Sequence, residues 1–125
     1  MIVGIGVDIA EIARVRELAG KFGQRFARRI LTDQELIEFD LRRQSSSYLA
    51  TRFAAKEAVA KALGTGIGKQ FGFHSVQVDH DQQGRPLLRF LDDAEELVAA
   101  LKIKNALISL SDEKHYVVAM VVLES

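Results

Sequence analysis

The sequence predicts one α+β domain over residues 1–125, in which a small antiparallel sheet packs against a long helix. Segments with strand character stand near both ends of the chain, at residues 2–9 and 115–123. An alanine-rich stretch without glycine or proline, residues 46–63, has high helix propensity. The chain has 125 residues, of which 48% are hydrophobic, and no repeat or linker, which is typical of a single domain that buries its own core.

Two hydrophobic patterns predict the first strand and the first helix. Residues 2–9 are apolar with interspersed glycines, which indicates a buried strand where Gly4 and Gly6 let another backbone approach closely. Apolar residues then recur at helical spacing through residues 11–22, and most basic residues lie off that stripe, so we expect an amphipathic helix. Gly23 is placed to end this helix.

Capping residues mark the next two helices. Thr32 stands three residues before Glu35, which is the spacing of a capping box and predicts a helix from there to about Arg43. Residues 46–63 predict the longest helix of the chain. Gly64 follows it in the position of a left-handed cap.

The second half of the chain predicts four strands and one more helix. Residues 73–78 and 87–90 favour two strands joined by a loop that contains the only proline, and residues 93–102 favour a helix. Residues 106–111 and 115–123 are expected to pair around a short turn, and the last of these strands is rich in valine.

Composition limits both the chemistry and the location. There is no cysteine, which excludes a disulfide framework, a thiolate nucleophile and a cysteine metal site, and makes a cytoplasmic location the simplest expectation. The longest uninterrupted apolar stretch, residues 116–123, is far shorter than the ~20 residues of a membrane-spanning helix. We therefore expect neither a membrane segment nor a membrane partner.

Charge is balanced overall but uneven along the chain. The 17 basic and 17 acidic residues cancel, yet the stretch from Arg14 to Arg29 holds six basic residues and only one acid, Glu17. Such a local positive field suits an acidic partner, although a solvated helix face would show the same pattern. No nucleic acid partner is expected, because the chain lacks tryptophan and a broad excess of basic residues.

Two acidic residues occupy positions that suggest more than packing. Glu57 lies within the long helix, which is apolar nearly all round, so its carboxylate needs a compensating cation. Lys61, one turn later, is one such cation, and the two would then form a structural ion pair. Asp8 ends the first apolar strand, either as an acid at the N-terminus of the next helix or as a neighbour of Glu57. Two carboxylates together form a usual Mg²⁺ site, because this cation prefers oxygen ligands and keeps some of its water for substrate phosphates.

A glycine-rich segment, Gly64-Thr-Gly-Ile-Gly-Lys69, follows the long helix. It is not a nucleotide P-loop, because it closes a helix rather than opening one and lacks a hydroxyl after the lysine. It either stops the helix or turns backbone N–H groups toward an anion. The cations near it in the sequence, which favour a phosphate, are Arg52, Lys56, Lys61 and Lys69. The three histidines lack metal-ligand spacing, and we interpret them as structural or surface residues.

Three blocks of the sequence occur together in a specific combination. They are Gly4-Ile-Gly-Val-Asp8-Ile-Ala-Glu11-Ile, then Arg28-Arg-Ile-Leu-Thr32 with Glu35, then Arg52-Phe-Ala-Ala-Lys56-Glu57-Ala-Val-Ala-Lys61-Ala-Leu-Gly64-Thr-Gly-Ile67. In this combination the chain resembles the holo-acyl-carrier-protein synthases, a family of bacterial phosphopantetheinyl transferases. The resemblance covers most of the chain, including the final strand.

The resemblance implies a magnesium-dependent enzyme that transfers 4′-phosphopantetheine from coenzyme A to a serine of apo acyl carrier protein, releases adenosine 3′,5′-bisphosphate and supports fatty acid biosynthesis. It implies a homotrimer with coenzyme A bound between neighbouring subunits. Asp8 and Glu57 would be the metal ligands, and Glu57 and Lys61 the catalytic residues. The implied coenzyme contacts are Arg52, Lys61, Gly64, Thr65 and Gly66. The implied docking residues for the carrier protein are Arg14, Lys21, Arg25 and Arg28.

The sequence departs from the family pattern in its penultimate strand. Many relatives carry His-Val-Ser-Ile-x-His there, whereas this chain has Leu107-Ile-Ser-Leu-Ser-Asp112. A role of those histidines does not transfer to this chain, and two candidates remain for the base that deprotonates the acceptor serine: Glu57, acting through a metal-bound water, and Asp112. Two other function classes also stay open, a non-catalytic binding module whose basic segment engages an acidic protein or a nucleic acid, and a degenerate family member retained as a structural subunit.

Overall fold

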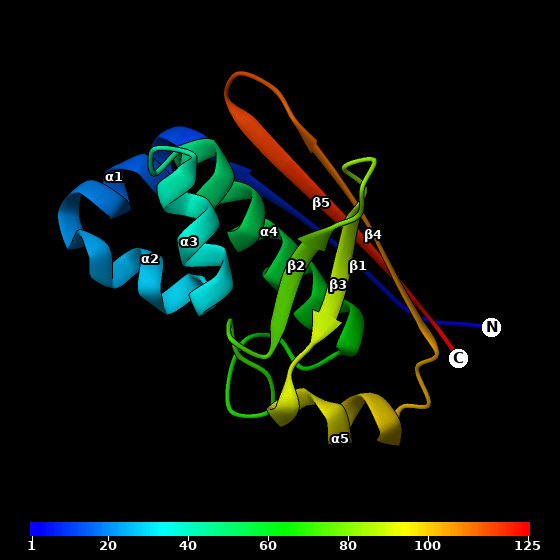
Figure 1. Cartoon of the computed structure of the whole chain (residues 1–125). Coiled ribbons are helices and arrows are strands. Elements are labelled where there is room, and N and C mark those ends of the chain that lie inside the picture. Colours follow the sequence, from blue (N-terminus) through cyan, green and yellow to red (C-terminus); the bar gives the residue numbers. More distant parts are fainter.

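The structure, a computed structural model, describes all of residues 1–125 (Figure 1). The helices are α1 (Ile12–Phe22), α2 (Gln24–Ile30), α3 (Asp33–Leu41), α4 (Ser46–Leu63) and α5 (Asp92–Ala100). The strands are β1 (Ile2–Glu11), β2 (Val76–His80), β3 (Pro86–Phe90), β4 (Asn105–Asp112) and β5 (Tyr116–Glu124). These elements confirm the α+β class. None of the helices has the length and hydrophobicity that a membrane-spanning segment requires.

The strands form two antiparallel sheets. β1, β5 and β4 lie side by side in this order, so the first and last strands are neighbours, and Figure 1 shows both termini at the same end of the molecule. β2 and β3 form a separate hairpin. The expected pairing of the last two strands is confirmed. The strand predicted from residue 73 begins only at Val76. The residues before it form a turn, in which the N–H of Ser75 donates to the carbonyl oxygen of Gly72.

β1 and α4 lie in direct backbone contact. A Cβ atom on Gly4 would lie 2.1 Å from the carbonyl oxygen of Ala62, and one on Gly6 would lie 2.0 Å from that of Ala58. Any other residue would therefore push the strand away from the helix. The predicted close approach is confirmed, and it holds the following residue on this face, Asp8, against α4.

The three-stranded sheet buries one face and exposes the other. On β5, Val117 and Val121 are completely buried beneath α4. The expectation that residues 2–9 form a wholly buried strand is wrong, because successive side chains of a strand point to opposite faces and α4 covers only one of them. The exposed large apolar residues of the outer face are Val3, Ile5, Val7, Ile9, Leu107 and Met120.

Local signals set most helix boundaries. Thr32 and Glu35 form the predicted capping box of α3, and Gly64 ends α4 in the left-handed conformation with φ of 80°. α2 is not predicted by the sequence pattern. Gly23, with φ of 63°, separates α2 from α1, so the basic residues between 14 and 29 lie on two helices rather than one.

A buried ion pair joins α3 and α4. The side chains of Lys56 and Glu35 are 0% and 2% exposed, and Nζ lies 2.5 Å from Oε1. Lys56 also donates to the carbonyl oxygen of Ile30, while Glu35 accepts from the backbone N–H groups of Thr32 and Val78. The expectation that Lys56 adds to a phosphate-binding set of cations is wrong, because its charge is enclosed in the core.

Candidate active site

Asp8 lies within β1 rather than at its end. The strand continues to Glu11, and α1 begins at Ile12 with no acidic residue in its first turn. The expectation that Asp8 ends the strand is therefore wrong, and so is the alternative that it is an N-terminal acid of α1. Asp8 shares the face of Gly4 and Gly6, which lies against α4, and its side chain is only 15% exposed.

Lys61 of α4 pairs with Asp8. Its Nζ lies 3.0 Å from Oδ1 of Asp8 and 3.0 Å from the carbonyl oxygen of Val7, to both of which it donates. The alternative pairing between Lys61 and Glu57 is not formed, although the two residues are one turn apart on the same helix. A contact between elements has thus replaced the local one, because β1 lies so close to α4 that Asp8 comes within reach of the lysine.

Glu57 is a partly buried acid with no ion-pair partner. Burial raises the pKa of its carboxyl above the ordinary value, the negative charge of Asp8 raises it further, and the positive charge of Lys61 partly opposes them. The two carboxylates are therefore close enough to repel each other. We refer to Asp8, Glu57 and Lys61 as the carboxylate group; the structure brings these three predicted site residues together.

The carboxylate group suits a hard divalent cation. No cluster of three or more His, Asp or Glu side chains in the structure could enclose a metal. Mg²⁺ does not need one, because it is commonly held by one or two carboxylates and takes water and substrate phosphates as its other ligands. A cation shared by Asp8 and Glu57 would also remove the repulsion that raises the pKa of Glu57. The residues present thus fit a Mg²⁺ site that substrate completes.

The segment after α4 closes the helix. Gly64 donates its N–H to the carbonyl oxygen of Lys61, and Thr65 and Gly66 both donate to that of Ala60. The Thr65 hydroxyl donates to the carbonyl oxygen of Gly66. The helix-stop interpretation is therefore the one that the structure supports. The N–H groups of residues 64–66 are already used, so they do not form the anion-binding nest that the sequence left open.

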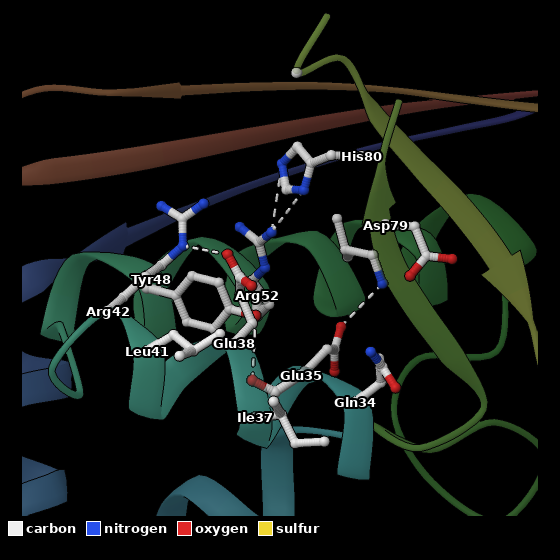
Figure 2. A pocket seen from close by; sticks show the side chains of 12 residues that line it. Gln34, Glu35, Ile37, Glu38, Leu41, Arg42, Tyr48, Arg52, Asp79 and His80 are labelled. Carbon is white, nitrogen blue, oxygen red and sulfur yellow. Dashed lines mark hydrogen bonds and ion pairs between the residues drawn. The ribbon is translucent and has the colours of Figure 1, made fainter. Parts of the chain in front are cut away.

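Arg52 is a buried cation without a carboxylate partner. It is 5% exposed, its Nη1 donates to the Thr51 hydroxyl at 3.0 Å, and its guanidinium lies 4.2 Å from the centre of the Tyr48 ring. Its Nε has no partner, and its Nη2 faces the ring of His80 (Figure 2). A buried charge without a counter-ion is costly, so this arrangement favours an anionic ligand.

Arg52 lies apart from the carboxylate group. It lines two cavities of about 500 and 430 Å³, and neither is lined by Asp8, Glu57 or Lys61. Glu57 lies five positions after Arg52 on α4, which corresponds to roughly 140° around the helix axis. The predicted site residues therefore form two groups on different sides of α4.

Asp112, the second candidate base, lies on the same side of α4 as Arg52. It lines the smaller of the two cavities together with Arg52, and its carboxylate accepts a hydrogen bond from the Ser47 hydroxyl at 3.3 Å. Glu57 is thus the candidate base that lies beside Asp8. Nothing in the spacing of residues 57 and 112 indicates this division, because it depends on where the end of β4 meets α4.

The predicted docking residues form an exposed basic surface over α1 and α2. Arg14 and Lys21 of α1 and Arg25 and Arg28 of α2 are all exposed. Their charges face solvent without ion-pair partners, since the four ion pairs of the structure involve other residues. The surface therefore has the charge that the sequence predicts, although two helices carry it rather than one.

An apolar groove, which the sequence does not predict, adjoins this basic surface. Two cavities of about 420 and 450 Å³ share Leu18, Phe26 and Phe53 in their walls. Arg25 lines one of them and Arg14 the other. The phenylalanines are visible in the sequence, but their spacing is equally typical of core residues, so only the structure shows that they line an open groove.

Comparison with known proteins identifies the family. The model of the 4′-phosphopantetheinyl transferase superfamily matches residues 4–121. A holo-[acyl-carrier-protein] synthase of Vibrio cholerae is 52% identical over 124 residues, which are 99% of this chain and 98% of that protein. The crystal structure of the Neisseria meningitidis holo-[acyl-carrier-protein] synthase is 44% identical, with a TM-score of 0.96 and full coverage of both chains. That of Helicobacter pylori holo-[acyl-carrier-protein] synthase, in complex with coenzyme A, is 31% identical, with a TM-score of 0.86 over 96% of this chain and 99% of that one. This chain therefore belongs to the 4′-phosphopantetheinyl transferase superfamily, among its holo-acyl-carrier-protein synthases.

Proposed function

We propose that this chain, as one domain over residues 1–125, transfers 4′-phosphopantetheine from coenzyme A to a serine of apo acyl carrier protein. It uses Mg²⁺, acts in the cytoplasm and supports fatty acid biosynthesis. The observation that carries the proposal is the carboxylate group, in which Glu57 has a raised pKa, no ion-pair partner and Asp8 as its neighbour. The names of its relatives, and the coenzyme A bound to one of them, support the substrates.

The reaction is a phosphoryl transfer. The serine oxygen forms a bond to the phosphorus that bears the pantetheine, and the bond from that phosphorus to the bridging oxygen breaks. The bridging oxygen leaves with the electron pair, as part of adenosine 3′,5′-bisphosphate. Asp8 and Glu57 would hold the Mg²⁺, which offsets negative charge on the diphosphate. Glu57 lies beside Asp8, whereas Asp112 lies on the Arg52 side of α4, and this position favours Glu57 as the base for the serine proton.

Contacts to the phosphates come from both sides of α4. Lys61 is half-exposed beside Asp8, so its ammonium can contact a phosphate bound at the carboxylate group. Gly64, Thr65 and Gly66 shape the loop that follows α4, at the proposed coenzyme site. Arg52 lines a cavity on the other side of α4. This position supports a coenzyme bound between subunits, in which one subunit supplies the carboxylate group and its neighbour supplies Arg52.

The exposed apolar face of the sheet supports a homotrimer. Met120 lies at its centre, paired with Val7 on one side and Ser109 on the other. We expect Met120→Lys to yield monomers and to lower transfer at least about tenfold, because a buried unpaired charge at an interface costs several kcal/mol. Light scattering measures the mass. The matched control is Leu101→Lys, an exposed apolar residue outside the sheet, which should leave mass and activity unchanged. A Met120→Lys protein that keeps the wild-type mass would contradict the proposed interface.

The basic surface over α1 and α2 supports docking of an acidic carrier protein. We expect Arg14→Glu combined with Arg25→Glu to raise the KM for the carrier about tenfold or more and to leave the KM for coenzyme A unchanged, because these charges steer only the protein partner. Initial rates at several salt concentrations measure both constants. Lys104→Glu, an exposed basic residue away from α1 and α2, is the control. An unchanged carrier KM in the double variant would remove these residues from the docking site.

The transfer itself is tested by mass spectrometry of the carrier. Apo acyl carrier protein, coenzyme A and Mg²⁺ are incubated with the chain, and the carrier should gain the mass of one phosphopantetheine group. Omission of the metal should stop the reaction. If the carrier mass stays the same under all conditions, the transferase proposal is wrong, and the binding-module or structural-subunit alternatives take its place.

A further inference from the structure

The guanidinium of Arg52 lies beside the imidazole ring of His80 (Figure 2). Nη2 of Arg52 lies 3.4 Å from Nδ1 and 3.4 Å from Nε2 of His80. The amino group therefore lies close to both ring nitrogens, and in a neutral imidazole the nitrogen without a proton can accept a hydrogen bond from it.

No charged group competes for Arg52 in this pocket. Each acid that lines the larger cavity with Arg52 and His80 has its own cation, since Glu38 pairs with Arg42, Glu35 with Lys56 and Asp79 with Arg89. Asp112, which lines the smaller cavity, accepts its hydrogen bond from Ser47. Arg52 is left with the Thr51 hydroxyl, the ring of Tyr48 and the ring of His80. Its orientation is thus determined by two aromatic rings and one hydroxyl.

His80 stands at the end of the β2–β3 hairpin. It is the last residue of β2 and pairs with Pro86 of β3. In the loop that follows, the Asp81 carboxylate accepts from the N–H groups of Gln83 and Arg85 at 2.9 and 2.8 Å. Hydrogen bonds within the loop thus order the hairpin end, which presents the ring of His80 to α4 from a different element.

We propose that His80 is a positioning residue, whose neutral ring holds the guanidinium of Arg52 in the orientation that binds a phosphate of coenzyme A. The inference rests on the proposed function, because it takes Arg52 as a phosphate contact. His80 does not itself need to touch the coenzyme. Its contribution is to replace the carboxylate that usually orients a buried arginine, which leaves the positive charge of Arg52 available to an anion.

The surroundings of His80 favour the neutral ring. Burial lowers its pKa below the ordinary value of 6.5, and the positive charges of Arg52 on α4 and Arg42 after α3 lower it further. Glu38 of α3 and Asp79 of β2 oppose this shift. The ring is therefore neutral at pH 7.5, and protonation in acid would place a second positive charge against Arg52.

The test compares KM and kcat for coenzyme A in the full-length enzyme at pH 7.5. His80→Ala should raise the KM about five- to tenfold and change kcat less than twofold, because only the orientation of a binding group is lost. Arg52→Met should raise the KM at least as much. The double variant should not exceed Arg52→Met, since His80 acts only through Arg52. His80→Phe keeps a ring but has no acceptor nitrogen and no titrating group, so its KM should rise as in His80→Ala and should depend less on acid than the KM of the wild type.

Three results would overturn the inference. An unchanged KM in His80→Ala removes the positioning role but leaves the phosphate contact of Arg52 intact. An unchanged KM in Arg52→Met removes both roles, while the carrier mass gain still reports on the transferase activity separately. Effects of the two substitutions that add in the double variant, together with a lowered melting temperature of His80→Ala, assign His80 to folding instead.

Discussion

Glu57→Gln should abolish phosphopantetheine transfer without destabilising the protein. We expect kcat/KM to fall about 10³-fold or more, because the substitution removes both a metal ligand and the favoured proton acceptor. The free energy of unfolding should stay within about 0.5 kcal/mol of wild type or rise, since the carboxylate has no ion-pair partner to lose and is repelled by Asp8. Transfer assays and urea unfolding measure the two quantities on the same preparation.

The pH dependence of stability gives an independent check. Because the folded-state pKa of Glu57 is raised, the folded protein binds this proton more tightly than the unfolded chain does. The stabilisation that Glu57 contributes is therefore present below its ordinary value of 4.5 and is lost as the pH rises through the raised folded value. The Glu57→Gln protein should not show this loss of stability as the pH rises. The control is Glu95→Gln, an exposed acid of α5, which should change neither activity nor stability. If Glu57→Gln lowers activity and stability together, Glu57 is a structural residue.

Lys56→Met should cause the largest loss of stability among the charged residues. It would leave the carboxylate of Glu35, which is 2% exposed, without its cation. Breaking a buried ion pair in this way costs about 3–5 kcal/mol, and the substitution also frees the carbonyl oxygen of Ile30. Urea unfolding of the purified protein measures the difference. Activity should be lost mainly through the smaller folded fraction, because Lys56 is enclosed in the core.

Two further variants distinguish the stability lost by breaking a buried ion pair from a general effect of removing a lysine or an arginine. Arg42→Met breaks the exposed Arg42–Glu38 pair and should cost less than about 1 kcal/mol. Glu35→Gln with Lys56→Met removes both buried charges, so its loss should be smaller than the sum of the two single losses by at least about 1 kcal/mol. A Lys56→Met protein as stable as Arg42→Met would contradict the enclosed pair.

Much of the fold was predictable because its signals are local. The capping box at Thr32, the left-handed cap at Gly64 and the alanine-rich run before it depend only on residues within one or two helical turns. α2 escaped prediction because its seven residues are too short for a clear hydrophobic period. The exposed outer face of β1 escaped because an apolar strand does not reveal whether one or both of its faces are covered.

The sequence by itself determined which residue types stand on which element: acids on β1 and α4, glycines where the two approach, and a basic stretch before residue 30. Only the tertiary structure decided which of them meet. It paired Lys61 with Asp8 instead of Glu57, enclosed Lys56 with Glu35, and placed Arg52 beside His80 rather than with the carboxylates. The reason is physical: helix and strand periods are set by neighbouring residues, whereas the partner of a charge depends on which elements pack together and on what that packing leaves exposed to water.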